Sequence, residues 1–169
     1  MSASVLLDTS FLISLVNAKR SHHQTAVQYY RHMLQNNMPM YFSAIVAAEF
    51  GIKQAITDLP LNNFRTIQFD VPHGQQAAHL WNALGQRDDG DIRAVVRDDV
   101  KLMAQASRES ISFILTEDAS TLHKYCERLR ATGNMQTRAI KLVDGFNANA
   151  LREDGQIDWV DDTSVDSDA

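Results

Sequence analysis

The chain alternates short, wholly apolar segments with longer segments in which apolar residues recur every three or four positions. The first pattern is typical of buried strands and the second of amphipathic helices. We predict strands at residues 4–7, 38–43 and 111–116, and a final strand within 138–146. We predict helices at residues 9–17, 22–37, 44–56, 73–86, 96–110 and 117–132. The pattern of residues 63–72 fits either a strand or part of a helix, and residues 87–94 are predicted to form a polar loop.

Strands that alternate with helices predict an α/β fold, specifically a three-layer α/β/α sandwich with a central parallel sheet. Parallel strands need crossover connections, and right-handed crossovers place helices on both faces of the sheet. Ligands of such open sheets bind beyond the carboxyl ends of the strands. Asp8 follows the first strand, and residues 116–118 end the strand at 111–116. We therefore expect these residues at the same edge of the sheet.

The composition is that of a soluble domain of 169 residues, with 44% hydrophobic and 22% charged residues. No segment approaches the ~20 apolar residues that span a bilayer, and the opening lacks the pattern of a signal peptide. Cys126 is the single cysteine, which excludes a disulfide framework and a cysteine zinc site. We expect a cytoplasmic protein that does not enter a membrane.

The acidic charge is concentrated at the end of the chain. Residues 153–169 hold seven of the 21 acids and none of the 16 Lys and Arg residues, so residues 1–152 carry a net charge of +2. We predict one domain at 1–152 and a disordered acidic tail at 153–169. The near-neutral domain is compatible with a nucleic-acid partner, because local patches matter more than the total charge.

Acidic residues occupy comparable positions in four predicted elements: Asp8, Glu49, the pair Asp98 and Asp99, and Asp118. Each alone has a structural explanation, since acids near helix N-termini complement the helix dipole. Together at one edge they would repel one another, and a divalent cation relieves such repulsion. Mg²⁺ and Mn²⁺ prefer oxygen ligands, and such an ion activates water for phosphodiester hydrolysis.

Four segments resemble, in order, the acidic motifs of the PIN-domain nucleases, in particular the VapC-type toxins of bacterial toxin–antitoxin pairs. They are "VLLDTSFLISL", "SAIVAAEF", "RDDVKLMAQA" and "ISFILTED". The resemblance spans about residues 4–130. It implies a PIN-like, Rossmann-like fold and cleavage of RNA that depends on Mg²⁺ or Mn²⁺. It also implies a homodimer and a small antitoxin protein that inserts a segment into the groove.

Carried over by position, the resemblance also implies which residues act. The catalytic and metal-binding acids would be Asp8, Glu49, Asp99 and Asp118. Hydroxyls near the metal would come from Thr9 or Ser10 and from Thr116.

Three features depart from the family pattern. Both Asp98 and Asp99 stand in the third motif; we predict Asp99 as the ligand, because it shares a helical face with the apolar residues of the following turns. Asp98 would then point elsewhere and serve as a helix cap. Glu117 stands where a basic or polar residue is frequent, which leaves open whether it touches the metal. Residues 135–169 have no counterpart in the pattern.

Other functions remain as alternatives. A housekeeping or orphan PIN nuclease in RNA processing would carry the same acids. A catalytically silent PIN-like scaffold that binds RNA or protein would not need all four. A phosphatase with Asp8 as its nucleophile would need, in the haloacid-dehalogenase-like pattern, a second Asp two positions later, where this chain has Ser10.

Several polar clusters call for simpler interpretations. Four cations surround the third acidic motif: Arg87, Arg93, Arg97 and Lys101. They either contact phosphates or offset the local acids, and we favour the second interpretation. We expect His22 and His23 to be surface residues, because adjacent helical positions point in different directions. The "DDGD" segment at 88–91 lacks the downstream Glu of a calcium loop, so we expect a polar loop.

Overall fold

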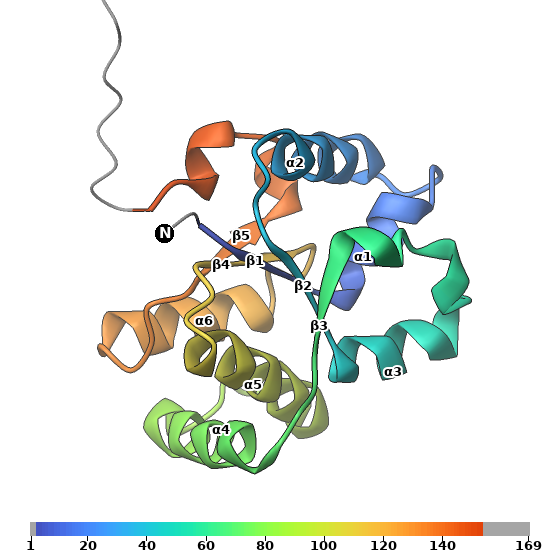
Figure 1. Cartoon of the computed structure of the whole chain (residues 1–169). Helices are drawn as coiled ribbons and strands as arrows, with labels where there is room; N and C mark the ends of the chain where they lie inside the picture. The colour runs from blue at the N-terminus through green and yellow to red at the C-terminus, as the bar shows by residue number, and fades with distance from the viewer. Residues whose placement is uncertain (1–2, 154–169) are drawn as a thin grey trace, which may run out of the picture.

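The computed structural model of the chain describes residues 3–153 (Figure 1). The strands are β1 (Val5–Leu7), β2 (Met40–Ser43), β3 (Phe64–Ile67), β4 (Phe113–Thr116) and β5 (Arg138–Lys141). The α-helices are α1 (Thr9–Val16), α2 (His23–Gln35), α3 (Ala44–Lys53), α4 (Val71–Leu84), α5 (Arg93–Arg108) and α6 (Leu122–Ala131). Short 3₁₀ helices lie at Ile56–Asp58, Leu61–Asn63, Leu142–Asp144 and Ala148–Leu151. The predicted acidic tail lies outside the described residues except for Glu153.

The five strands form one parallel sheet in the order β3-β2-β1-β4-β5. The chain moves outward from β1 to β3, returns past β1 to β4, and then moves outward to β5. With right-handed crossovers this path puts α1, α2 and α3 on one face and α4, α5 and α6 on the other, as Figure 1 shows. The predicted three-layer α/β/α fold is confirmed.

The two central strands are apolar except for Thr116 at the end of β4, as expected where helices cover both faces of the sheet. The three side chains of β1 are fully buried, and all four residues of β4 are buried as well. β1 pairs with β4 in a register that sets Leu7 beside Leu115, so β4 extends by only one residue, Thr116, beyond the end of β1. The residue that follows each strand therefore arrives at the same edge.

The undecided segment at 63–72 holds both kinds of element. β3 is an edge strand, and its two central residues, Arg65 and Thr66, are exposed. Asp70 then begins α4: its Oδ1 accepts a hydrogen bond from the backbone N–H of His73 at 3.2 Å, and the His73 ring accepts one from the Asp70 N–H at 3.2 Å. This reciprocal cap explains why a short strand is followed so closely by a helix.

Two helices differ from their predicted bounds near the acidic motifs. α5 begins at Arg93 rather than at residue 96, so Asp98 lies inside the helix, and the prediction that it caps the helix is wrong. α6 begins at Leu122 rather than at residue 117. The intervening residues turn around the Asp118 side chain, whose Oδ1 accepts hydrogen bonds from the backbone N–H groups of Ser120 and Thr121. Such local side-chain bonds compete with helix formation.

Two smaller differences concern the ends of elements. α3 ends at Lys53, because Gln54 has an extended backbone, although a helix to residue 56 was predicted. The final strand is confined to β5, and a 3₁₀ helix follows it.

Among residues 3–153, no helix combines the length and the apolar character needed to cross a membrane.

Candidate active site

Asp8 lies at the carboxyl edge of the sheet, where β1 passes into α1. Its backbone N–H continues the ladder by donating to the Leu115 carbonyl at 3.1 Å. Its Oδ2 accepts hydrogen bonds from the hydroxyl of Ser10 at 2.8 Å and from that of Thr116 at 2.7 Å. The two hydroxyls, one from α1 and one from the end of β4, fix the orientation of a carboxylate that is only 8% exposed.

Glu49 approaches the same edge from α3, on the face of the sheet that α1 and α2 also cover. The hydroxyl of Thr9, the residue after Asp8, donates to Glu49 Oε2 at 2.5 Å. Because Thr9 is buried and begins α1, this bond ties the start of α1 to the middle of α3. Thr9 and Ser10 therefore hold two different carboxylates.

Asp99 and Asp118 meet through Thr121. Asp99 comes from α5, on the other face of the sheet, and Asp118 follows β4. The Thr121 hydroxyl lies 2.6 Å from Asp99 Oδ2 and 2.5 Å from Asp118 Oδ2. One hydroxyl has one proton, so it donates to one of the two carboxyl groups at a time. Both carboxyl groups can form a hydrogen bond with the Thr121 hydroxyl at the same time only when one of them carries a proton of its own.

The electrostatics show that the carboxyl groups sense one another. Burial, together with the negative charges of Asp8, Asp118 and Glu49, raises the pKa of Asp99 to about 8, against the opposing effect of the hydrogen bond from Thr121. Burial also raises the pKa of Asp8, more than the hydroxyls of Thr116 and Ser10 lower it. These shifts are those of acids from four elements that gather at one place.

Asp118 behaves differently because the turn that follows it supplies many donors. Burial would raise its pKa, but hydrogen bonds from Thr121 and Ser120 outweigh burial and hold the pKa below its usual value. Asp118 is therefore the charged member and Asp99 the protonated member of the Thr121-bridged pair at neutral pH.

The other two acids of the motifs are turned elsewhere. Glu117 Oε2 accepts hydrogen bonds from the Ser14 hydroxyl at 2.9 Å and from the Arg20 guanidinium at 2.6 Å. Burial raises the pKa of Glu117, but Arg20 and Ser14 lower it more, so the side chain is a carboxylate engaged by α1 and the loop after it. Asp98 pairs with Lys101 at 3.2 Å on the half-exposed side of α5.

The cations around the third motif divide into two groups. Lys101 offsets Asp98, as expected. The guanidinium groups of Arg87 and Arg93 each lie 5.8 Å from the centre of the Trp81 ring, and neither forms an ion pair with an acid among residues 3–153. Arg97 likewise forms no ion pair in this part of the chain, so no ion pair supports the charge-offsetting interpretation for these three arginines. The "DDGD" segment is the expected polar loop, anchored to α6 through ion pairs of Asp88 and Asp91.

The donor set at this edge fits a hard cation by its chemistry, because it consists of carboxylate and hydroxyl oxygens without thiol or imidazole. Within the described part of the chain, no three His, Cys, Asp or Glu side chains are yet arranged as a complete metal site. Each acid is held by a hydroxyl: Asp8 by Ser10 and Thr116, Glu49 by Thr9, and the remaining two acids by Thr121. Binding an ion would require the four side chains to rearrange around it.

A cavity of about 930 Å³ lies elsewhere, at the amino-terminal ends of β4 and β5. Its lining includes Ser112, Phe113 and Arg138. Because Asp8 and Asp118 follow the opposite ends of the strands, this cavity is not part of the acidic site.

Reasoning from the sequence missed Thr121 and Arg20. Thr121 carried a signal, because an Asp followed two and three positions later by Ser and Thr is a frequent turn before a helix. Arg20 carried none: it is 97 positions from Glu117, and only the fold brings the two together.

Comparisons with known proteins support the same fold and family. The PIN domain model matches residues 5–127, which is more than half of the chain. No curated protein matches the sequence. VapBC2 from Rickettsia felis, solved bound to a DNA fragment from its promoter, has a TM-score of 0.55 at 16% identity and covers 80% of this chain and 97% of its own. FitAcB from Neisseria gonorrhoeae has a TM-score of 0.55 at 16% identity and covers 82% and 98%.

A third solved structure is VapC20 from Mycobacterium tuberculosis, described as a Sarcin-Ricin loop cleaving toxin. It has a TM-score of 0.51 at 18% identity and covers 80% of this chain and 99% of its own. Identities this low establish the shared fold alone, whereas the family model covers most of the chain. The chain belongs to the PIN domain family.

Proposed function

We propose that this protein is a metal-dependent endoribonuclease and the toxin of a toxin–antitoxin pair. The observation that carries the proposal is the meeting of Asp8, Glu49, Asp99 and Asp118 at the carboxyl edge of a parallel sheet, from four separate elements. Nucleases of the PIN domain family are hydrolases that act on nucleic acids and generally use divalent metals, so both family and site favour this reaction.

The four acids would hold Mg²⁺ or Mn²⁺, which when bound lowers the pKa of a water molecule and neutralises charge on a phosphoryl oxygen. Ser10 and Thr116 keep the Asp8 carboxylate aimed at the edge of the sheet. Thr9 does the same for Glu49. Asp99 must release its proton to act as an anionic ligand, so its raised pKa makes ion affinity increase towards alkaline pH.

The solved neighbours favour a toxin. Their descriptions include VapBC and FitAB complexes, three of them bound to DNA, and one Sarcin-Ricin loop cleaving toxin. By analogy we propose a small antitoxin protein as partner, RNA as substrate, a homodimer in solution and a cytoplasmic location. The alternative is a housekeeping or orphan PIN nuclease. The complete set of four acids argues against a catalytically silent scaffold.

The first experiment measures cleavage of single-stranded RNA with Mn²⁺ or with a chelator. We expect the wild type to cleave with Mn²⁺ only, and Asp8→Asn or Asp118→Asn to lose cleavage by at least about 10³-fold while the circular dichroism spectrum stays unchanged. Asp98→Asn is the matched control, because Asp98 pairs with Lys101 outside the site. Equal cleavage by the wild type and both variants would refute the nuclease assignment.

A second experiment separates toxin from housekeeping nuclease. Induced expression of the wild type should arrest growth of a bacterial host, and Asp8→Asn should not. RNA cleavage in vitro without growth arrest would favour the orphan nuclease.

A further inference from the structure

We propose that Arg20, held in place by Glu117, forms a phosphate-binding subsite for the RNA backbone beside the acidic site, with His22 as a second donor. The proposal rests on the proposed function and names a part of the substrate-binding surface. It starts from an electrostatic problem. Among residues 3–153, none of the four carboxylates of the site forms an ion pair with a Lys, Arg or His side chain. A polyanionic substrate therefore needs cations supplied close by.

Arg20 is connected to the site by a short series of hydrogen bonds. The Ser10 hydroxyl that donates to Asp8 at 2.8 Å also accepts the backbone N–H of Glu117 at 2.8 Å. The Glu117 carboxylate in turn accepts from Arg20 at 2.6 Å. Glu117 is also the residue directly before Asp118. The guanidinium is thus linked to the acidic site through Glu117, and it forms no ion pair with the four acids.

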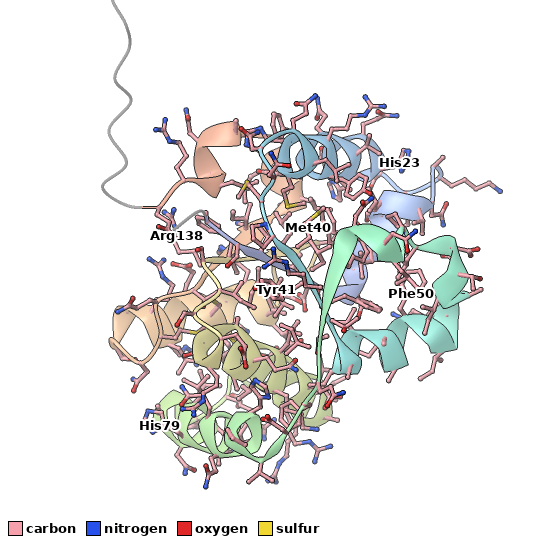
Figure 2. All side chains as sticks on the ribbon, viewed as in Figure 1. His23, Met40, Tyr41, Phe50, His79 and Arg138 are labelled. Carbon is pink, nitrogen blue, oxygen red and sulfur yellow. The ribbon has the colours of Figure 1, made fainter. Side chains whose placement is uncertain are left out.

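The residues that hold Arg20 are themselves fixed by hydrogen bonds. The Glu117 oxygen that accepts from Arg20 also accepts from the Ser14 hydroxyl at 2.9 Å, and the Ser14 carbonyl contacts the His23 ring at 2.9 Å. His23 begins α2 beside α1 (Figure 2). The Arg20 backbone itself is bonded on both sides, to the Asn17 carbonyl and from the His23 N–H. A group held in its binding geometry loses little entropy when a ligand binds.

The guanidinium keeps most of its binding capacity. Arg20 has five N–H donors, and Nη2 is the nitrogen that bonds to Glu117. Its side chain is 44% exposed, whereas Glu117 is 17% exposed. The planar fork suits two oxygens of a phosphate group. His22, 27% exposed and with its Nε2 4.0 Å from Glu117 Oε1, lies at the same carboxylate.

Glu117 precedes Asp118 directly and its backbone N–H bonds to Ser10, so a phosphate bound by Arg20 is a neighbour of the reacting phosphate. Glu117 is a positioning residue in this arrangement, and Arg20 contacts the substrate. This role also explains why position 117 is acidic: the Glu117 carboxylate orients the Arg20 guanidinium.

The test measures binding of a fluorescent single-stranded RNA to the full-length Asp8→Asn protein, in which cleavage is blocked. Adding Arg20→Ala should weaken binding by about tenfold or more, and should reduce the slope of log K against log salt by about 0.7, the value for one phosphate contact on a single strand. Arg20→Lys should keep the salt slope but recover the affinity only in part, because it loses the fork geometry. Glu117→Gln should give a smaller loss than Arg20→Ala.

Arg31→Ala is the matched control, because Arg31 is an exposed arginine on α2. Equal affinity and equal salt slope for the Arg20→Ala and Arg31→Ala proteins would overturn the subsite. In the cleaving protein, Arg20→Ala should raise KM more than it lowers kcat. If the wild type cleaves no RNA, the proposed function fails, and the binding measurement still tests the subsite. If the wild type cleaves RNA and the Arg20→Ala protein binds RNA normally, only the subsite fails. Stronger binding of a single-stranded DNA of the same sequence would show that the subsite does not serve RNA.

Discussion

At the scale of single residues, the site is organised by hydroxyl groups as much as by carboxylates. Ser10 and Thr116 hold Asp8, Thr9 holds Glu49, and Thr121 joins the other two acids. Each hydroxyl satisfies a buried or half-buried carboxyl group that would otherwise be costly to leave without a partner. The hydroxyls therefore keep like charges together although no Lys, Arg or His among residues 3–153 pairs with these acids.

Thr121→Val removes the hydroxyl that bridges Asp99 and Asp118 but keeps the shape of the side chain. We expect RNA cleavage to fall by about tenfold or more, because the two carboxyl groups lose the hydroxyl that bridges them, including a hydrogen bond to a charged carboxylate worth about 1.5–3 kcal/mol. Thr121→Ser keeps the hydroxyl and should restore most of the activity. Cleavage rates of the three proteins check this; equal loss in the Ser and Val variants would contradict the role of the hydroxyl.

Asp99 should make the metal-free protein less stable as the pH rises. Its pKa in the folded state is about 8, above the ordinary value of 3.8, so the folded state binds more protons between these values. The stability that this group contributes is complete below about pH 4 and is lost as the pH rises through 8. In Asp99→Asn, the melting temperature measured in chelator should fall less between pH 6 and pH 9 than in the wild type.

Asp98→Asn serves as the control for that measurement, since Asp98 is outside the acidic site. A wild-type protein and an Asp99→Asn variant with the same fall in melting temperature would show that Asp99 does not titrate in this range.

At the scale of elements, the ends of helices decide where the functional groups stand. Because the Asp118 side chain accepts the backbone N–H of Thr121, α6 begins only at Leu122. Thr121 therefore lies before the helix, where its hydroxyl contacts Asp99. The His73 ring, which is part of the α4 cap, contacts Glu109 at the end of α5 at 2.8 Å. This contact joins the start of α4 to the end of α5. The cap thus helps to set the position of the helix that carries Asp99.

Asp70→Ala should remove the cap of α4. We expect the free energy of unfolding to fall by about 1 kcal/mol, because N-cap replacements by Ala typically cost this much. The melting temperature should fall by about 2–4 °C. Asp89→Ala, at an exposed loop position, is the control and should leave it unchanged. An equal melting temperature for the Asp70 variant and the wild type would show that the cap contributes nothing.

At the scale of the whole molecule, the site exists because the parallel sheet gathers residues from both of its faces. Glu49 comes from α3 on one face and Asp99 from α5 on the other, while Asp8 and Asp118 leave adjacent strands between them. No segment of the chain contains the site by itself. The pairing of β1 with β4 joins residues that are 108 positions apart, such as Thr116 and Asp8.

Removal of residues 155–169 should leave the fold intact. These residues lie outside the described part of the chain, so the expectation rests on their composition: they are acidic, without Lys or Arg, and a solvated tail adds little to a core. The last buried apolar residue described is Leu151. Thermal unfolding of the truncated chain checks this, and a fall in melting temperature of several degrees would show that the tail is docked.

The sequence alone determined the fold class, the position of most elements and which acids stand at strand ends, because periodicity and local composition are properties of neighbouring residues. Asp8 after an apolar strand was visible in the first eight residues. The start of α6 was not, since it depends on side-chain bonds within the turn at Asp118.

Only the tertiary structure decided which side chains meet. It turned Glu117 towards Arg20, set Asp98 against Lys101 and brought Thr121 between two acids. It also raised the pKa of Asp99 to about 8, which no local pattern could indicate. Burial and the charges of distant residues act through space, and the distances that govern them are fixed only when the sheet is assembled.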